Sequence, residues 1–365
     1  MIPISRPDLS SLEKQYINEA YDSTWVSSSG KFIELAETLV AEMAGTRFAV
    51  LTANGTVAIH LALLGVGIEP GDEVIVPSFT FISSVNAIRY CGAIPIFVDV
   101  DKENWTLNPT LIEKLITPKT KAILAVNLYG HPFDFVKVNY IAQKFNLKVV
   151  EDNAEAPGGK AFGKATGSLG DIGTFSFFGN KILTAGEGGA VTTNDESTSD
   201  RLKILRDHGM SRTTKYKFDV IGFNYRMTNI SAALLFGQLQ RFNELISHRF
   251  NLYQLYDEIV STSMLVESQP ISKWAEISPW LYPIVCISEE IKNKIILNLS
   301  SLEIETRPFF PPVHMQAPYV SSYVGDLGVT NDLSSRGFLL PTASNFSEVE
   351  ISYLMKSVKS SIEIA

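Results

Sequence analysis

Residues 174–189 read TFSFFGNKILTAGEGG, and this stretch places Lys181 between an aromatic-rich segment and a run of glycines. Aromatic side chains are usually buried, and glycines permit unusual backbone turns, so these are not the usual neighbours of a solvated surface lysine. Two interpretations are open: Lys181 is placed there for chemistry, or the stretch is an unusual loop. The segments on either side decide between them.

Short β-branched runs alternate with helical patterns from about residue 45 to residue 200, which predicts a mainly parallel sheet covered by helices. The expected strands cover residues 48–51, 74–76, 94–98, 122–126 and 148–151. Residues 56–67 have the periodicity of an amphipathic helix. Residues 11–23 and 31–45 predict two further helices that flank the sheet, the first with Ser11 as a candidate N-cap.

The pattern changes after about residue 245, where weaker strands and helices follow, including PWLYPIVCI (279–287) and a closing helix over 348–364. A chain of 365 residues exceeds what one hydrophobic core usually covers. We therefore expect a large α/β domain with N-terminal helices over residues 1–245, and a small C-terminal α+β domain over residues 246–365.

Composition excludes several classes of function. The formal net charge is −8, and lysines and arginines are scattered, so no basic stripe exists for nucleic acid. Cys91 and Cys286 lie far apart in apolar segments, which predicts buried free thiols and neither a disulfide framework nor a metal site. No signal peptide or membrane-spanning apolar run is apparent, so the expected location is the cytoplasm.

Residues 158–167, GGKAFGKATG, place Gly158, Gly163 and Lys164 at nearly the spacing of a P-loop. The next residue is Ala165, which lacks the hydroxyl group that a P-loop uses for magnesium, and the residues that follow are poor helix starters. A glycine-rich hairpin is the better interpretation, and a nucleotide triphosphatase is disfavoured.

Residues 52–63, TANGTVAIHLAL, follow an expected strand and begin an expected helix. The backbone amides of Gly55 and Thr56 would then point outward at a helix N-terminus, where the helix dipole favours a phosphate group. An ordinary strand-to-helix turn capped by Asn54 is the alternative.

Residues 149–156, VVEDNAEA, place Glu151, Asp152 and Glu155 at the carboxyl end of an expected buried strand. Ligands of open parallel sheets bind beyond the carboxyl ends of the strands, so these carboxylates are candidate ligand contacts. A helix cap is the alternative. The strand-like segments between Asp152 and Lys181 are able to bring the two side chains together.

Taken together, these segments supply what pyridoxal 5'-phosphate (PLP) requires. A lysine forms an imine with the aldehyde, a carboxylate keeps the pyridine nitrogen protonated, and an aromatic ring stacks on the cofactor. Lys181, Asp152 and an aromatic residue of PSFTFISS (77–84) supply these parts, while Ser176 and the anion site at residues 55–56 are placed for the phosphate. Lys181 is therefore expected to be catalytic.

Five motifs carry a family resemblance: NGTVAIHLAL (54–63), GDEVIVPSFTF (71–81), EDNAEA (151–156), TFSFFGNKILTAGEGG (174–189) and GFNYRMTNISAAL (222–234). In this order they resemble the DegT/DnrJ/EryC1/StrS family of sugar aminotransferases over nearly the whole chain. The resemblance implies an aspartate-aminotransferase-like fold of type I. It also implies a homodimer whose two active sites lie at the subunit interface.

The resemblance also implies residue roles. Lys181 would bind the cofactor covalently, Asp152 would pair with the pyridine nitrogen, and Phe81 would stack on the ring. Ser176 and the amides of Gly55 and Thr56 would hold the phosphate.

Two further roles are implied. Asn224 would reach the phosphate of the neighbouring subunit's cofactor. Glu155 would lie near the ring hydroxyl, where many members have glutamine. A relative that acts as a 3-dehydratase has histidine at the position of Lys181, so the lysine of this chain implies transamination instead.

Three stretches narrow the expected substrate class, because they are similar to family members that aminate GDP-4-keto-6-deoxy-mannose: STWVSSSGKFI (23–33), NYRMTN (224–229) and ETRPFFPPVH (305–314). The expected reaction moves the amino group of L-glutamate to the C4 ketone of this nucleotide-linked sugar. Pro311 replaces a common tyrosine, and Thr184-Ala185 replaces a common Thr-Thr or Thr-Ser, so a dTDP- or UDP-linked keto sugar stays open. A non-catalytic PLP-bound sensor is the remoter alternative.

Candidate contacts to the sugar or diphosphate follow by analogy. They are Trp25, Ser28, Lys31, Arg226 and His314. For His314 a structural role between prolines is the alternative, and Arg307 and Arg336 fit structural salt bridges equally well.

Overall fold

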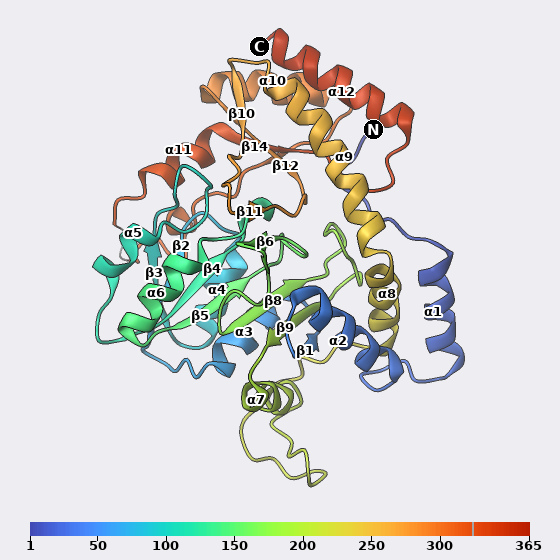
Figure 1. The fold of residues 1–365 in the computed structure, drawn as a ribbon, viewed down its shortest axis with the longest axis vertical. Coiled ribbons are helices and arrows are strands. Elements are labelled where there is room, and N and C mark those ends of the chain that lie inside the picture. The colour runs from blue at the N-terminus through green and yellow to red at the C-terminus, as the bar shows by residue number, and fades with distance from the viewer. Residues whose placement is uncertain (323–324) are drawn as a thin grey trace.

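The computed structural model describes residues 1–322 and 325–365 and has a central sheet with helices on both faces, below a smaller C-terminal part (Figure 1). Within the described residues, the central sheet has seven strands in the order β1-β9-β8-β5-β4-β2-β3. The strands are β1 (Phe48–Thr52), β2 (Glu73–Pro77), β3 (Ile94–Val98), β4 (Thr120–Val126), β5 (Lys148–Asp152), β8 (Ile172–Ser176) and β9 (Gly189–Thr193).

The central sheet is mainly parallel, as predicted. The pairs from β3 through β8 are parallel, and only β9 runs antiparallel to its neighbours β1 and β8. All five expected strands are confirmed, with ends shifted by at most two residues. These strands are nearly continuous apolar runs because helices bury both faces of the sheet.

Alternate residues of each strand pack into different clusters, since successive side chains of a strand point to opposite faces. Val74 and Val76 belong to one buried cluster, whereas Ile75 between them belongs to another. The first face is covered by α3 (Gly55–Gly65), α4 (Ile82–Tyr90) and α7 (Glu196–Arg206). The second face is covered by α5 (Pro109–Ile112) and α6 (Phe135–Phe145) at one end, and by α2 (Lys31–Ala44) and α8 (Asn229–Gln240) at the other.

The first helix, α1 (Ser11–Asp22), begins at a different cap from the one predicted. Ser10, not Ser11, is the N-cap, and its hydroxyl accepts a hydrogen bond from the backbone N–H of Leu12. The prediction was wrong by one residue because Glu13 closes a capping box, and this places the cap three residues before the glutamate.

The C-terminal part contains an antiparallel sheet in the order β10-β12-β14-β13. Its strands are β10 (Val266–Ser268), β12 (Tyr282–Cys286), β13 (Arg307–Pro308) and β14 (Gly337–Leu340). Its helices are α9 (Phe242–Val260), α10 (Glu289–Ser301), α11 (Gly328–Arg336) and α12 (Glu348–Glu363). The expected strand in residues 279–287 and the closing helix are confirmed.

Helix α9 connects the two parts of the chain. Leu245 belongs to the cluster under α2 and α8, whereas Leu252 and Tyr253 belong to the cluster of the C-terminal sheet. The expected division after residue 245 therefore falls within one helix, where the packing changes from the first part to the second. The two-domain division stays a prediction.

The remaining elements are short. Residues 158–167 form the expected hairpin, in which β6 (Lys160–Ala161) pairs with β7 (Lys164–Ala165) and with β11 (Ala275–Glu276). Single 3-10 turns are η1 (Glu113–Leu115), η2 (Leu128–Gly130) and η3 (Val313–Met315). Cys91 and Cys286 are buried free thiols, as predicted, and burial raises the pKa of each to about 12. Among the described residues, no helix is both long and apolar enough to cross a bilayer.

Candidate active site

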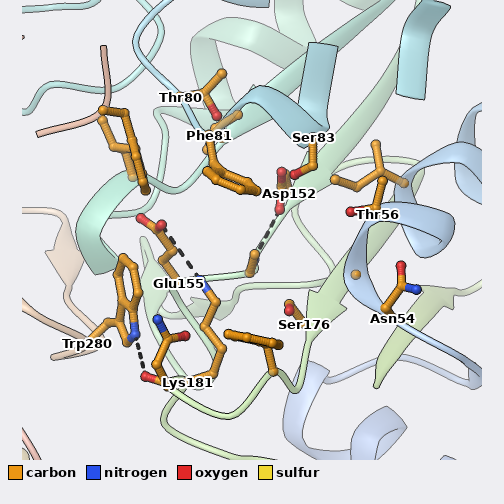
Figure 2. A pocket seen from close by; sticks show the side chains of 18 of the residues that line it. Asn54, Thr56, Thr80, Phe81, Ser83, Asp152, Glu155, Ser176, Lys181 and Trp280 are labelled. Carbon is orange, nitrogen blue, oxygen red and sulfur yellow. Dashed lines mark hydrogen bonds and ion pairs between the residues drawn. The ribbon is translucent and has the colours of Figure 1, made fainter. Parts of the chain in front are cut away.

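A cavity of about 630 Å³ lies beyond the carboxyl ends of the central strands. Its lining comes from the segments after β1, β2, β4, β5 and β8, together with residues of the C-terminal part. The lining includes these predicted cofactor residues: Gly55, Thr56, Phe81, Asp152, Glu155, Ser176 and Lys181. Figure 2 shows that most of them point toward one another across the cavity.

The N-terminus of α3 forms one end of this cavity, and we call it the phosphate end. Asn54 is the N-cap and accepts a hydrogen bond from Val57 N–H at 3.0 Å. Within the described residues, the amides of Gly55 and Thr56 have no protein acceptor. The cap and the anion site are therefore compatible, because the cap uses a different N–H.

Gly55 allows α3 to approach β8 closely. A Cβ atom at Gly55 would lie 2.7 Å from the Cβ and 2.9 Å from the Oγ of Ser176, which is too close for any larger residue. The glycine therefore brings the helix N-terminus next to the Ser176 hydroxyl. Figure 2 shows Asn54, Thr56 and Ser176 on the same side of the cavity.

Asp152 ends β5 at the middle of the cavity and is 4% exposed. It accepts hydrogen bonds from Ser84 Oγ at 2.7 Å and from Ala154 N–H at 3.1 Å. Burial raises its pKa, and these two hydrogen bonds and the charge of Lys181 oppose the rise. The helix-cap alternative is wrong, because residues 153–158 form turns and no helix follows.

Lys181 lies at the other end of the cavity, in the loop between β8 and β9. Its Nζ is 3.7 Å from Glu155 Oε1 and 3.9 Å from the centre of the Trp280 ring. Burial lowers the pKa of Lys181, while the charges of Glu155 and Asp152 oppose this change. We call Lys181, Glu155 and Trp280 the amine end of the cavity.

Glu155 is 5% exposed, and its Oε2 accepts the backbone N–H of Tyr129 at 2.9 Å. Burial raises the pKa of Glu155 to about 7, with Lys181 opposing the rise. Because the pKa of the lysine falls while that of the glutamate rises, burial brings the two groups toward values at which they can share a proton.

Phe81 is the N-cap residue of α4 and remains 53% exposed. Its ring centre lies 5.6 Å from that of Phe310, which also lines the cavity. The ring therefore has an accessible surface on which a planar ligand can stack.

The other predicted residues lie outside this lining. Asn224 lies in the segment between α7 and α8, and its Oδ1 accepts a hydrogen bond from Arg226 Nε at 3.2 Å. Arg226 also bonds Asp207 at 2.6 Å. Tyr225, between these two residues, accepts the backbone N–H of Ala53 at 2.8 Å and donates its own N–H to Arg206 O at 3.1 Å, so this part of the segment lies against the body of the chain. Neither Asn224 nor Arg226 lines the cavity of its own chain.

Trp25 and Lys31 line a separate hollow with Phe32 and Asn229. Asn229 Nδ2 donates to Trp25 O at 2.7 Å, and Lys31 pairs with Glu19. Ser28, nearby in the chain, is half-buried. The structure therefore groups this N-terminal segment with α8 and not with the cavity.

His314 is held against β2 by two contacts with one residue. Its Nδ1 lies 2.7 Å from Ser78 Oγ, and its backbone N–H donates to the same oxygen at 3.1 Å. Since His314 is outside the cavity lining, these contacts favour the structural alternative. Arg336 pairs with Asp332, whereas Arg307 lines the cavity and has only a loose pairing with Glu305 at 3.7 Å.

Sequence reasoning missed Trp280 and did not assign Arg307 to the cavity. Trp280 is 3% exposed and bonds the backbone of Asn180, a residue 100 positions away. No local pattern marks such a long-range contact. Within PWLYPIVCI, Trp280 is an apolar residue like the core residues that follow it, so the motif does not distinguish it from them.

These features fit PLP. Within the described residues, the amides of Gly55 and Thr56 have no protein acceptor and suit a phosphate group, and the absence of a side chain at Gly55 leaves space beside Ser176. The buried Lys181 and Asp152 line the rest of the same cavity. Fold and cavity thus define an α/β enzyme that uses a PLP cofactor.

The particular family follows from comparison with known proteins. Residues 7–359 match the DegT/DnrJ/EryC1/StrS aminotransferase family, and the chain belongs to it. The chain is 44% identical to GDP-perosamine synthase of Escherichia coli O157:H7 over 98% of this chain and 97% of that protein. It is 42% identical to the GDP-perosamine synthase of Caulobacter vibrioides, over 96% and 95% of the two chains.

Solved structures agree on the fold. A putative sugar aminotransferase from Streptococcus pneumoniae, solved in its PMP-form, superposes with a TM-score of 0.93 at 26% identity and covers 100% of both chains. The predicted fold class is confirmed, and the protein is a PLP-dependent aminotransferase.

Proposed function

We propose that this enzyme transfers the amino group of L-glutamate to the C4 ketone of GDP-4-keto-6-deoxy-D-mannose, giving GDP-perosamine and 2-oxoglutarate. The observation that supports this chemistry is the buried Lys181 amine. Lys181 lines the same cavity as Asp152 and the phosphate end. The choice of sugar is supported by the similarity to GDP-perosamine synthases over nearly the whole chain.

The proposed residue roles follow the geometry of the cavity. PLP, when bound, supplies the electron sink that lets an amino group exchange with a ketone. The amides of Gly55 and Thr56 and the hydroxyl of Ser176 hold its phosphate at the phosphate end. Asp152 keeps the pyridine nitrogen protonated, and Phe81 packs on the ring.

Lys181 anchors the cofactor and, when free, accepts and returns a proton at Nζ. A lysine needs a lowered pKa for this work, and burial of Lys181 provides it. Glu155 would lie near the ring hydroxyl of the bound cofactor, next to the amine. Once the cavity is filled, bulk water is excluded from both Lys181 and Glu155, because each is largely buried.

The test of this reaction uses purified enzyme with PLP and L-glutamate. Parallel samples receive GDP-, dTDP- and UDP-linked 4-keto-6-deoxy sugars, and mass spectrometry identifies the amino sugar. We expect conversion of the GDP-sugar. Conversion of only a dTDP- or UDP-sugar would reassign the substrate, and no conversion by protein that binds PLP would favour a sensor.

We further propose that the protein is a homodimer whose two active sites are each shared between the subunits. We also propose that it acts in the cytoplasm. Asn224 and Arg226 lie outside the cavity of their own chain, in the segment between α7 and α8. In a dimer this segment, with Trp25, Ser28 and Lys31, could complete the cavity of the second copy, where Asn224 would reach the phosphate.

Mixing two inactive variants tests the shared site. Lys181→Ala and Asn224→Ala homodimers are each expected to show little activity at low PLP. After denaturation and joint refolding, mixed dimers hold one intact cavity, so part of the activity should return. If activity does not return although mass spectrometry detects mixed dimers, Asn224 does not act across the interface.

A further inference from the structure

Trp280 lies two residues before the start of β12, in the C-terminal part of the chain, yet its side chain lines the cavity. The ring is 3% exposed, and its centre is 3.9 Å from Lys181 Nζ. At this distance the π-face of an indole attracts an ammonium group, and tryptophan gives the strongest such attraction among the aromatic side chains.

Hydrogen bonds hold both the indole ring and the backbone of Trp280. Its Nε1–H donates to the carbonyl oxygen of Asn180 at 2.9 Å, so the ring is attached to the residue that precedes Lys181. The backbone oxygen of Trp280 accepts hydrogen bonds from Arg249 Nη1 at 2.8 Å and from Thr342 Oγ1. Arg249 is itself buried, so the residue that holds the Trp280 backbone is also held in place.

Glu155 lies beside the lysine amine together with the indole. Its Oε1 is 3.7 Å from Lys181 Nζ, and its other oxygen is fixed by Tyr129 N–H. Figure 2 shows Glu155 and Trp280 together at one end of the cavity, with Lys181 extending toward them. A carboxylate and a π-face both stabilise an ammonium group over a neutral amine, so the two contacts act in the same direction.

A lysine that leaves the cofactor needs a defined place. The side chain has a flexible four-carbon stem, and a free amine that moved among many rotamers would spend little time near the reacting atoms. The indole face and the Glu155 carboxylate offer contacts for an ammonium group that a cofactor-bound lysine does not need.

We propose that Trp280 is a positioning residue, which together with Glu155 forms the resting place of the Lys181 amine whenever that amine is free. The inference rests on the proposed transamination. Lys181 Nζ accepts one proton, the indole face and the Glu155 carboxylate hold the resulting ammonium beside the substrate, and Nζ then returns the same proton. No other reactant is consumed in this step.

The direct test measures the pKa of Lys181 in the cofactor-free protein. Acetic anhydride labels the lysine at a series of pH values, and mass spectrometry of the peptide that contains residue 181 gives the labelled fraction. Trp280→Leu should lower the pKa of Lys181, because the ammonium loses the π-face, and Trp280→Phe should lower it less. Trp274→Leu is the control, since Trp274 stacks on Phe162 outside the cavity.

A second test follows the reaction with L-glutamate alone, through the loss of the visible absorbance of the bound cofactor. Trp280→Leu should slow this half-reaction about tenfold at saturating glutamate, and Trp280→Phe should restore part of the rate. The glutamate concentration that gives half the maximal rate should stay unchanged, since Trp280 acts through Lys181.

The outcomes separate this inference from the proposed function. An unchanged Lys181 pKa in Trp280→Leu would overturn the resting place, whichever sugar is the substrate. A folded wild-type protein that binds PLP but does not react with glutamate would overturn the transamination, and the labelling experiment would still report whether Trp280 holds the amine.

Discussion

The two ends of the cavity are built in different ways. At the phosphate end, consecutive backbone amides of α3 lie beside one hydroxyl of β8, and the glycine at position 55 sets their separation. At the amine end, Lys181, Glu155 and Trp280 come from three segments that meet only through tertiary packing. The first end depends on local backbone geometry, whereas the second depends on side chains brought together by the whole fold.

The largest effect is expected at the amine end from Lys181→Ala. This variant loses both the covalent anchor and the group that moves the proton, so turnover should fall by about 10⁴-fold or more. Steady-state assays of amino-sugar formation measure the loss, and circular dichroism should show an unchanged fold. Wild-type-like turnover by the folded variant would remove Lys181 from the mechanism.

Asp152→Asn should have the next largest effect. Asp152 lies in the middle of the cavity, between the phosphate end and the amine end. An amide cannot hold the pyridine nitrogen protonated, so turnover should fall by about 10²- to 10³-fold while PLP remains bound. Glu151→Gln is the matched control. Glu151 precedes Asp152 in β5 but bonds the backbone amides of Gly167 and Leu169, away from the cavity. Equal losses in the two variants would point to a structural effect.

Much of the fold could be predicted from the sequence because its signals are local. Apolar runs and strand-to-helix turns fix the positions of β1 to β5, and the sheet then places Asp152 and Gly55 at the same edge. The strand-to-helix turn at residues 54–56 was predicted for the same reason. Asn54, Gly55 and Thr56 are adjacent in the chain, so one motif contains most of the geometry.

The contacts that could not be predicted are those between distant segments. Trp280 reaches Lys181 only because β12 and the loop after β8 pack together, and no residue near Trp280 indicates this. His314 stands in a motif that suggests ligand contact, but the structure pairs it with Ser78, from another part of the chain. The Ser10 cap was missed for a smaller reason, since Ser10 and Ser11 both fit and only Glu13 distinguishes them.

Gly55→Ala tests the phosphate end through its backbone. A methyl group at this position would lie 2.7 Å from Ser176 Cβ, so α3 must move away from the hydroxyl. Overpacking of this kind costs about 1–3 kcal/mol, so PLP affinity should fall by roughly 5- to 160-fold. Equilibrium dialysis of PLP measures it. Gly179→Ala is the control, because a Cβ there would meet nothing within 4 Å, and equal affinities in both variants would contradict the close-approach argument.

The smallest effect concerns the pH dependence of stability at the amine end. Burial raises the pKa of Glu155 from 4.5 to about 7 in the folded protein. Glu155 therefore imposes no cost below about pH 4.5, where it is protonated in both states, and it destabilises the folded state increasingly as the pH rises toward 7. In the cofactor-free protein, Glu155→Gln should gain stability relative to wild type progressively across this window, by about 1 kcal/mol per pH unit.

Urea unfolding of both proteins between pH 4.5 and 7.5 measures this difference. Glu276→Gln serves as the control, since Glu276 is exposed and pairs with Lys160 at the surface, and its difference from wild type should not follow the same trend. If the curves of wild type and Glu155→Gln run parallel, the Lys181 ammonium keeps Glu155 ionised throughout. The amine end would then be a permanent ion pair, and the proton that Lys181 returns could not be shared with Glu155.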